Sequence, residues 1–450
     1  MMQKQDGIVS EKELLAGKGV DQINLFKLIR YVSESKLARK VESYAVHVET
    51  EANTSQYGQM QTTKTQASSS KPELTTSPVL HTISTLLSAL TNPSKEGRLF
   101  FTKSPTSPDQ ITLSYLLLDP STSFSTIVSQ ARAVLLAGGT MSPFSDYTTH
   151  LFPTISPSQI ITLSCGHVIP SSNLLAWTLS KGPSGREFNF TFKNRQDNEM
   201  IDELGRALLN ICSVVPDGVV VFFPSYAYLS SILSRWETSL SPSNTSLLSR
   251  LKSKKALFKE SKEESVETVL TSYAQAIDSG QGGLLLSVVG GKMSEGINFS
   301  DSLGRCVVIV GLPFPNINST EWKAKIEYIE SATIDRLSSP DPSQLESGLS
   351  DGIQENGLSK EEVLRRAKEQ GREFYENACM RAVNQSVGRA IRHKGDYAAI
   401  VMIDSRFSGE RIKGKLPGWI QGGLVEGAAE KNFGSLMGAL GGFFRGKKGL

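Results

Sequence analysis

The sequence predicts an α/β fold in which a doubly wound parallel sheet is covered by helices on both faces. From about residue 153 onward, short apolar runs such as 218–223 (GVVVFF), 284–289 and 306–311 alternate with amphipathic stretches. These runs have no polar side to turn toward water, which is typical of strands buried on both faces. In 198–212 the apolar residues recur at steps of three and four, which is the period of a helix.

The remaining elements are expected as follows. Residues 21–45 predict an amphipathic helix within a helical segment, 1–50. Residues 51–78 hold eleven Ser or Thr and almost no large apolar side chain, which predicts a disordered insert. A flexible insert is expected at 331–359, and a basic, Gly-rich tail at 431–450. Further helices are predicted near 79–91, 123–131, 225–237, 263–278 and 361–383. Further β-like runs are expected at 111–118, 133–137, 160–164, 187–192 and 397–403.

Composition and cysteine usage narrow the class of protein. Hydrophobic residues make up 39% and charged residues 21% of the 450 residues, as in ordinary globular proteins of two or three domains. No apolar run reaches the length of about 18 residues that a membrane span needs, so we expect an intracellular protein without a membrane partner. Cys165, Cys212, Cys306 and Cys379 lie far apart, which predicts buried thiols and no metal site.

A Gly-rich segment, 134–147 (VLLAGGTMSPFSDY), directly follows a predicted strand. It carries the hydroxyls of Thr140 and Ser142 beside two glycines. Ligands of open α/β sheets bind beyond the carboxyl ends of the strands, so these groups can bind a phosphate or couple two domains. A Gly-rich turn between a strand and a helix would explain the same residues.

A second segment, 219–229 (VVVFFPSYAYL), ends a buried strand in Pro224, Ser225 and Tyr226. Proline stops a strand, and the hydroxyl of Ser225 can cap the helix that follows. Helix capping alone would account for this sequence. Its place after a strand nevertheless makes Ser225 and Tyr226 candidates for ligand contact.

The third segment, 284–316, concentrates polar groups between two apolar strands. Glycines permit close backbone approach to a ligand, and Lys292 supplies a positive charge. Glu295 and Asn298 can orient neighbouring donors. A structural loop would rarely combine all of these features, which belong to Gly290, Gly291, Lys292, Ser294, Glu295, Gly296 and Asn298.

The fourth segment, 382–407, contains Gln385-x-x-Gly388-Arg389-x-x-Arg392. On a helix, positions 385, 389 and 392 share one face. Two guanidiniums on one face repel each other unless an anion lies between them, and the terminal phosphate of a nucleoside triphosphate provides that anion. The alternative is an exposed helix with scattered arginines.

Together the runs GGTMSP, FFPSY, GKMSEGINF and QSVGRAIR resemble motifs III, IV, V and VI of XPD-like iron–sulfur helicases of superfamily 2. The fuller runs CGHVIP, GLPFPN and NQSVGRAIRH are similar to the chromosome-loss branch, which acts in sister-chromatid cohesion. The resemblance covers roughly residues 21–430 apart from the two inserts. It implies the end of a first RecA-like domain at 79–152 and a complete second RecA-like domain at 153–430.

The resemblance implies an ATP-dependent DNA helicase that moves 5′ to 3′ on single-stranded and forked DNA in replication, repair and cohesion. ATP and Mg²⁺ as cofactors, a nuclear location, and replication or cohesion proteins as partners are implied with it. Arg389 and Arg392 would be arginine fingers, with Gln385 and Gly388 beside the γ-phosphate. Nucleotide contacts are implied for Glu295, Gly296 and Asn298, the last standing where many relatives carry Asp, and DNA contact or coupling for Thr140, Ser142, Ser225, Tyr226, Lys292 and Ser294.

Three elements of that family do not occur in these 450 residues: a G-x-x-x-x-G-K-[ST] phosphate loop, a D-E-x-H box and the four cysteines of its [4Fe-4S] cluster. The chain is therefore interpreted as the C-terminal half of such a motor, inactive by itself. Two alternatives stay open. The chain can be a non-catalytic module that binds nucleic acid or a partner, or a subunit that completes an ATPase in trans.

Overall fold

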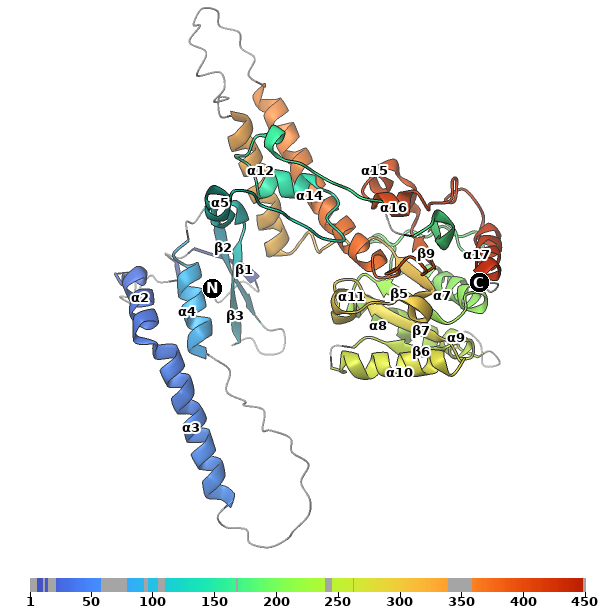
Figure 1. Cartoon of the computed structure of the whole chain (residues 1–450), viewed down its shortest axis with the longest axis horizontal. Coiled ribbons are helices and arrows are strands. Elements are labelled where there is room, and N and C mark those ends of the chain that lie inside the picture. The colour runs from blue at the N-terminus through green and yellow to red at the C-terminus, as the bar shows by residue number, and fades with distance from the viewer. Residues whose placement is uncertain are drawn as a thin grey trace, which may run out of the picture. The chain divides into compact units, whose positions relative to one another are not determined.

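The computed structural model describes residues 6–10, 13–14, 22–57, 79–92, 96–103, 110–166, 169–238, 245–261, 263–338 and 358–447. The chain forms two compact units (Figure 1). The first comprises Met1–Thr126 and Asn318–Tyr328, and the second Ile127–Ile317 and Ile329–Leu450. Among the described helices none is long and apolar enough to cross a membrane.

The first unit is built on a three-stranded antiparallel sheet with the order β1 (Asp6–Val9), β2 (Gly97–Lys103), β3 (Ile111–Leu117). Phe100 of β2 lies opposite Ile8 on one side and Ser114 on the other. The small core of this sheet consists of Val9, Leu90, Leu99 and Phe101. The helices of the unit are α2 (Leu25–Ser35), α3 (Leu37–Tyr57) and α4 (Val79–Ala89), while α5 (Pro120–Gln130) and α12 (Thr320–Ser338) continue into the second unit.

The helix expected at 21–45 is broken into α2 and α3 at Lys36, which has a left-handed φ of 52°.

The first residues of both predicted inserts are helical. Helix α3 continues to Tyr57, so 51–57 are helical rather than disordered, and 58–78 lie outside the described residues. Likewise 331–338 belong to α12, and 339–357 lie outside the described residues.

The second unit contains a six-stranded, wholly parallel sheet. Apolar residues fill its strands on both faces, as predicted for 218–223, which forms β5 with the same bounds. The prediction of an α/β fold with a RecA-like, doubly wound parallel sheet is therefore confirmed. The strand order is β4 (Leu174–Leu179), β9 (Ala398–Ile403), β8 (Cys306–Val310), β5 (Gly218–Phe223), β7 (Gly283–Val288), β6 (Ala256–Lys259).

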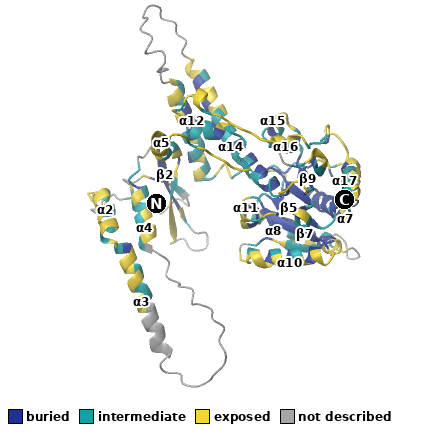
Figure 2. Ribbon diagram, viewed as in Figure 1, coloured by how far each residue is buried: buried dark blue, intermediate teal, exposed yellow. Residues whose placement is uncertain are grey.

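Helices cover both faces of this sheet, whose strands are the most buried part of the unit (Figure 2). Alternate residues of β5 point to opposite faces, with Val219 and Val221 in one core and Val220 and Phe222 in the other. The first face carries α7 (Asn198–Val214), α8 (Tyr226–Glu237), α9 (Leu247–Lys252) and α17 (Phe433–Lys447). The second face carries α10 (Val266–Asp278), α11 (Lys292–Gly296), α14 (Lys360–Val387), α15 (Glu410–Lys413) and α16 (Gly418–Gln421).

Three predicted β-like runs form no strand. Residues 133–137 and 160–164 pair with none of the described strands, and their side chains Leu135 and Ile161 are 92% and 94% exposed. Residues 187–192 contribute only an isolated bridge between Glu187 and Lys181. A strand needs a neighbour to receive its backbone hydrogen bonds, so apolar character alone does not make one.

The second unit extends beyond the predicted second domain, 153–430, at both ends. Residues 127–152, expected in the first domain, belong to the second unit. Within the expected tail, 433–447 form helix α17, because Phe433, Leu436, Leu440 and Phe444 form an apolar stripe at helical spacing that is buried against the sheet.

Leu440→Ala should therefore destabilise the second unit by about 2–5 kcal/mol, the usual cost of truncating a fully buried leucine. Urea unfolding followed by circular dichroism measures this free energy. Met437→Ala is a matched control on the same helix, since Met437 is only partly buried. Equal, small effects of both substitutions would show that α17 is a loosely attached tail.

Candidate nucleotide and nucleic-acid site

The segment that carries Arg389 and Arg392 is not a continuous helix. Helix α14 ends at Val387, and the N–H of its C-cap, Gly388, bonds to the carbonyls of Asn384 and Ser386. Arg389 and Arg392 follow in the irregular segment that enters β9. The prediction that Gln385, Arg389 and Arg392 share one helical face is therefore wrong.

The structure nevertheless brings both arginines onto the polar loop 289–304, which connects β7 to β8. Arg389 Nε donates to the carbonyl oxygen of Ser294 over 3.2 Å, and Arg392 Nη2 donates to Asn298 Oδ1. The backbone adds a third link, since Phe299 N donates to the carbonyl of Arg389 over 3.2 Å. Two of the four predicted segments are thus joined by their own candidate residues, in particular by Asn298.

Thr140, from the Gly-rich segment, reaches the same place. A Cβ added to Gly388 would lie 3.2 Å from Thr140 Cγ2 and 3.1 Å from the carbonyl of Asn384, so glycine permits this close approach. Ser142 and Gln385 are both half-buried. The Gly-rich segment therefore adjoins the end of α14, as coupling between these two segments requires.

The end of β5 carries Ser225 and Tyr226. The hydroxyl of Ser225 accepts the N–H of Tyr228 over 3.2 Å and caps α8, which confirms the structural explanation of this serine. The phenol of Tyr226 donates to Glu260 Oε1 over 2.6 Å. Burial, followed by the hydrogen bond to Glu260, raises the pKa of Tyr226 to about 12.

Glu260 links the carboxyl ends of three strands and was not predicted. Its side chain, 3% exposed, directly follows β6. Besides Tyr226 it accepts from Ser287 Oγ at 2.6 Å, from Val288 N at 3.1 Å and from Met293 N at 3.3 Å. This carboxylate fixes the start of α11 relative to β5, β6 and β7.

The remaining candidate residues of the 289–304 loop lie on α11 and differ in exposure. Lys292 is exposed at the first position of this helix. Ser294 is buried and its hydroxyl donates to the carbonyl of Gly291 over 2.9 Å, while its role in DNA contact or coupling stays a prediction. Gly296 is exposed with open space around its Cα, whereas the side chain of Glu295 lies outside the described residues.

Tyr226→Phe should lower the free energy of unfolding by about 1 kcal/mol below pH 10, because one hydrogen bond to a buried carboxylate is lost. The folded-state pKa is raised, so this contribution is present below the ordinary value of 10 and is lost as the pH rises toward about 12. Urea unfolding of both proteins at a series of pH values measures the difference. A difference that grows above pH 10 would contradict the assigned bond.

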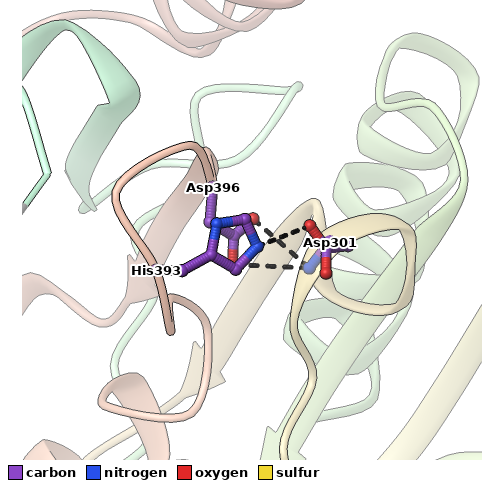
Figure 3. Close-up of side chains that lie close together, drawn as sticks. All are labelled: Asp301, His393 and Asp396. Carbon is purple, nitrogen blue, oxygen red and sulfur yellow. Dashed lines mark hydrogen bonds and ion pairs between the residues drawn. The ribbon is translucent and has the colours of Figure 1, made fainter.

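A buried carboxylate, Asp396, holds the entrance to β9 (Figure 3). Asp396 is 1% exposed and accepts from Arg305 Nη1 at 3.1 Å and from the backbone N–H of Arg392 at 3.3 Å. It also accepts from the N–H groups of Tyr397 at 2.9 Å and Asp301 at 3.3 Å. Asp396 therefore fixes the backbone that carries Arg392 against the end of the 289–304 loop.

Asp301, His393 and Asp396 are the one group of described His, Cys, Asp and Glu residues close enough to hold a metal ion. The group does not fit Mg²⁺, which prefers about six oxygen ligands, because N–H donors occupy both carboxylate oxygens of Asp396. His393 Nε2 lies 2.9 Å from Asp301 Oδ1, and both side chains are exposed. The geometry is that of a hydrogen-bonded clamp.

The cysteines do not fit an iron–sulfur cluster either. Cys212, Cys306 and Cys379 are buried as predicted, whereas Cys165 is exposed. None of the four belongs to a described metal-holding group. Burial raises the pKa of the Cys212 thiol to about 12, and also raises those of Cys306 and Cys379, which opposes formation of the thiolate that iron binds.

One more buried carboxylate, Asp146, attaches the segment after Thr140 to α14. Its Oδ1 accepts from Asn377 Nδ2 over 2.7 Å, and Arg381 forms an ion pair with it. Asp146, Glu260 and Asp396 were all missed from the sequence. Asp146 and Asp396 lie inside the predicted segments 134–147 and 382–407, but a single carboxylate has no pattern that marks it.

Comparison with known proteins identifies relatives of this chain. A family model described as "Helicase C-terminal domain" matches residues 208–423, which contain β5 to β9 and both arginines. This part of the second unit is therefore similar to helicase C-terminal domains.

The chain is 52% identical to "ATP-dependent DNA helicase CHL1" of Sclerotinia sclerotiorum, over 98% of this chain and 52% of that protein. It is 48% identical to "ATP-dependent DNA helicase chl1" of Neosartorya fischeri, over 98% of this chain and 47% of that protein. A solved structure named "XPD_Helicase" is 19% identical with a TM-score of 0.44, over 75% of this chain and 48% of that one. In sequence the chain belongs to the CHL1-type helicases. It spans about half the length of the curated relatives it matches.

Proposed function

We propose that this chain is the C-terminal motor half of an ATP-dependent DNA helicase that moves 5′ to 3′ on single-stranded DNA. The observation that carries the proposal is the joining of Arg389 and Arg392 to the 289–304 loop through Ser294 and Asn298. We also propose a nuclear location and a role in replication, repair and sister-chromatid cohesion, since the relatives are CHL1 helicases.

The nucleotide would be held by a phosphate loop on the other half of the motor, because these 450 residues contain none. Arg389 and Arg392 would then meet the charge that develops on the γ-phosphate during hydrolysis. Mg²⁺, which neutralises phosphate charge when bound, would take its ligands from that other half too, since no described group here fits it.

The 289–304 loop offers a route from hydrolysis to DNA movement. One end of the loop carries exposed Lys292 at the carboxyl edge of the sheet, where a phosphodiester can reach it. The same loop accepts both arginines further along. If the guanidiniums transfer their hydrogen bonds to the γ-phosphate, Ser294 O and Asn298 Oδ1 lose a partner and the loop is released to shift Lys292.

ATP turnover tests this proposal. The chain alone, with single-stranded DNA, should hydrolyse no ATP, and addition of a separately expressed N-terminal half with a phosphate loop should produce DNA-stimulated turnover. Strand displacement by the mixture should require a 5′ rather than a 3′ single-stranded tail. Turnover by the chain alone, or unwinding from a 3′ tail, would contradict the proposal.

A second candidate is a non-catalytic module that binds single-stranded DNA, favoured by the absence of a phosphate loop. This function predicts DNA binding with no turnover in the mixture. Binding to the DNA backbone should weaken steeply with salt, because counterions are released from the phosphates. The ATPase assay of the mixture separates the two candidates.

A further inference from the structure

Phe192 is an aromatic ring left in solvent on the second unit. It is 79% exposed, whereas every other Phe, Tyr and Trp among the described residues of this unit is at least partly buried. The guanidinium of Arg195 lies over its ring, 4.6 Å from the centroid. One face of the ring is thus covered by a cation, and the high exposure leaves the rest open to a ligand.

The backbone around Phe192 is fixed at the carboxyl edge of the sheet. Phe190 N donates to Asp404 Oδ2 over 3.0 Å, and Ser405 N donates to the carbonyl of Phe188 over 2.8 Å. Asp404 directly follows β9. A Cβ on Gly311, which follows β8, would lie 2.8 Å from Phe190 Cβ. Phe192 is therefore held beyond the ends of β8 and β9.

The ring shares this edge with the groups at the end of β5. Arg195 lies 5.9 Å from the ring centroid of Tyr228, in the first turn of α8, which Ser225 caps. Tyr226 is in the same turn and donates to Glu260. Glu260 also accepts from the N–H of Met293, which follows Lys292 beyond the end of β7. Phe192 and Lys292 thus lie along one edge of the sheet.

The charge of this edge favours a polyanion. Lys193 and Lys292 are exposed, and Arg195 is half-buried beside the ring. Of the acidic residues nearby in sequence, Asp197 and Glu199 are both paired with Arg186, and Glu187 is exposed.

We propose that Phe192 is a stacking platform for one unpaired base of single-stranded nucleic acid, with the base on the ring face opposite Arg195. The inference rests on the proposed function and adds to it a residue that lies outside the four segments 134–147, 219–229, 284–316 and 382–407. Every base has a π-face, so the platform accepts any base, while Arg195 and Lys193 contact the adjacent phosphates. A ring that already bears a guanidinium on one face is held in place for stacking on the other.

Fluorescence anisotropy of the full chain tests the platform with two probes of about 12 nucleotides, oligothymidylate and an abasic strand with the same phosphates. Phe192→Ala should raise the Kd for oligothymidylate about tenfold and leave the Kd for the abasic strand within about twofold. Phe192→Trp should retain tight binding. Phe192→Leu, which keeps apolar bulk without a π-face, should behave as the alanine variant does.

Charge and stacking are separated by salt. Lys193→Ala should reduce the slope of log K against log salt by about one, whereas Phe192→Ala should leave that slope unchanged. Phe192 is exposed, so its variants should melt at the wild-type temperature.

Equal losses on the two probes, or wild-type affinity of Phe192→Ala or Phe192→Leu, would overturn the platform while leaving the proposed function intact. Failure of the wild-type chain to bind either probe would overturn the proposed DNA contact and the platform with it.

Discussion

Arg389→Ala and Arg392→Ala should each lower the ATP turnover of the reconstituted motor about 10³- to 10⁵-fold. A guanidinium that meets the γ-phosphate stabilises charge that exists only in the transition state, and no other group replaces it. The measurement is kcat of this chain mixed with a separately expressed phosphate-loop half and saturating single-stranded DNA. KM for ATP should change much less than kcat.

Lys394→Ala is the matched control for this experiment. Lys394 is an exposed cation two residues after Arg392 and has no contact with the 289–304 loop among the hydrogen bonds of the described residues. Its removal should leave kcat within about twofold of wild type. Arg392→Lys should remain impaired, because an ammonium does not reproduce the planar fork of donors. Loss of less than tenfold in both alanine variants would contradict a finger role.

Asp396→Ala should lower the free energy of unfolding by about 3–5 kcal/mol, which is the cost of removing one partner from a buried ion pair. Arg305, whose side chain is 11% exposed, would lose its buried carboxylate, and three backbone N–H groups would lose their acceptor. The backbone that precedes β9 would lose these hydrogen bonds as well. Urea unfolding followed by circular dichroism measures the change.

Asp301→Asn provides the comparison for this prediction. Asp301 has a left-handed φ of 57°, which asparagine tolerates, and its exposed carboxylate contacts only exposed His393 in the described structure. The substitution should cost less than about 1 kcal/mol. Similar costs for Asp301→Asn and Asp396→Ala would show that the clamp does not depend on the buried carboxylate.

Continuous apolar runs located most strands of the parallel sheet from sequence. Residues 218–223 form β5 with the predicted bounds, and the runs at 284–289, 306–311 and 397–403 form β7, β8 and β9 within one residue. The helical spacing of Ile201, Leu204, Leu208 and Ile211 located α7. These elements are buried on a whole face, so their sequence pattern is unambiguous.

Pairing and chain direction were harder to predict. Strand β4 was not predicted, and the edge strand β6 is only four residues long. The runs at 133–137 and 160–164 look like strands but have no described neighbour. In α17, glycines between Phe433 and Phe444 concealed an apolar stripe. Local sequence does not encode which segment lies alongside, so such elements depend on tertiary contacts.

The sequence predicted which segments form the candidate site but not how their side chains are arranged in space. The sequence identified Arg389, Arg392 and Asn298, which the structure brings together, but placed the arginines on a helix that ends at Val387. Glu260 and Asp396 were missed because a single carboxylate has no pattern. Their importance lies in the N–H groups that converge on them from several strands.

A structure of the reconstituted motor bound to DNA and a γ-phosphate analogue such as ADP–beryllium fluoride tests the central claim most directly. The account predicts that the guanidiniums of Arg389 and Arg392 lie within hydrogen-bond distance of the analogue and have left Ser294 O and Asn298 Oδ1. Both guanidiniums remaining on the 289–304 loop, with the analogue beyond their reach, would contradict it.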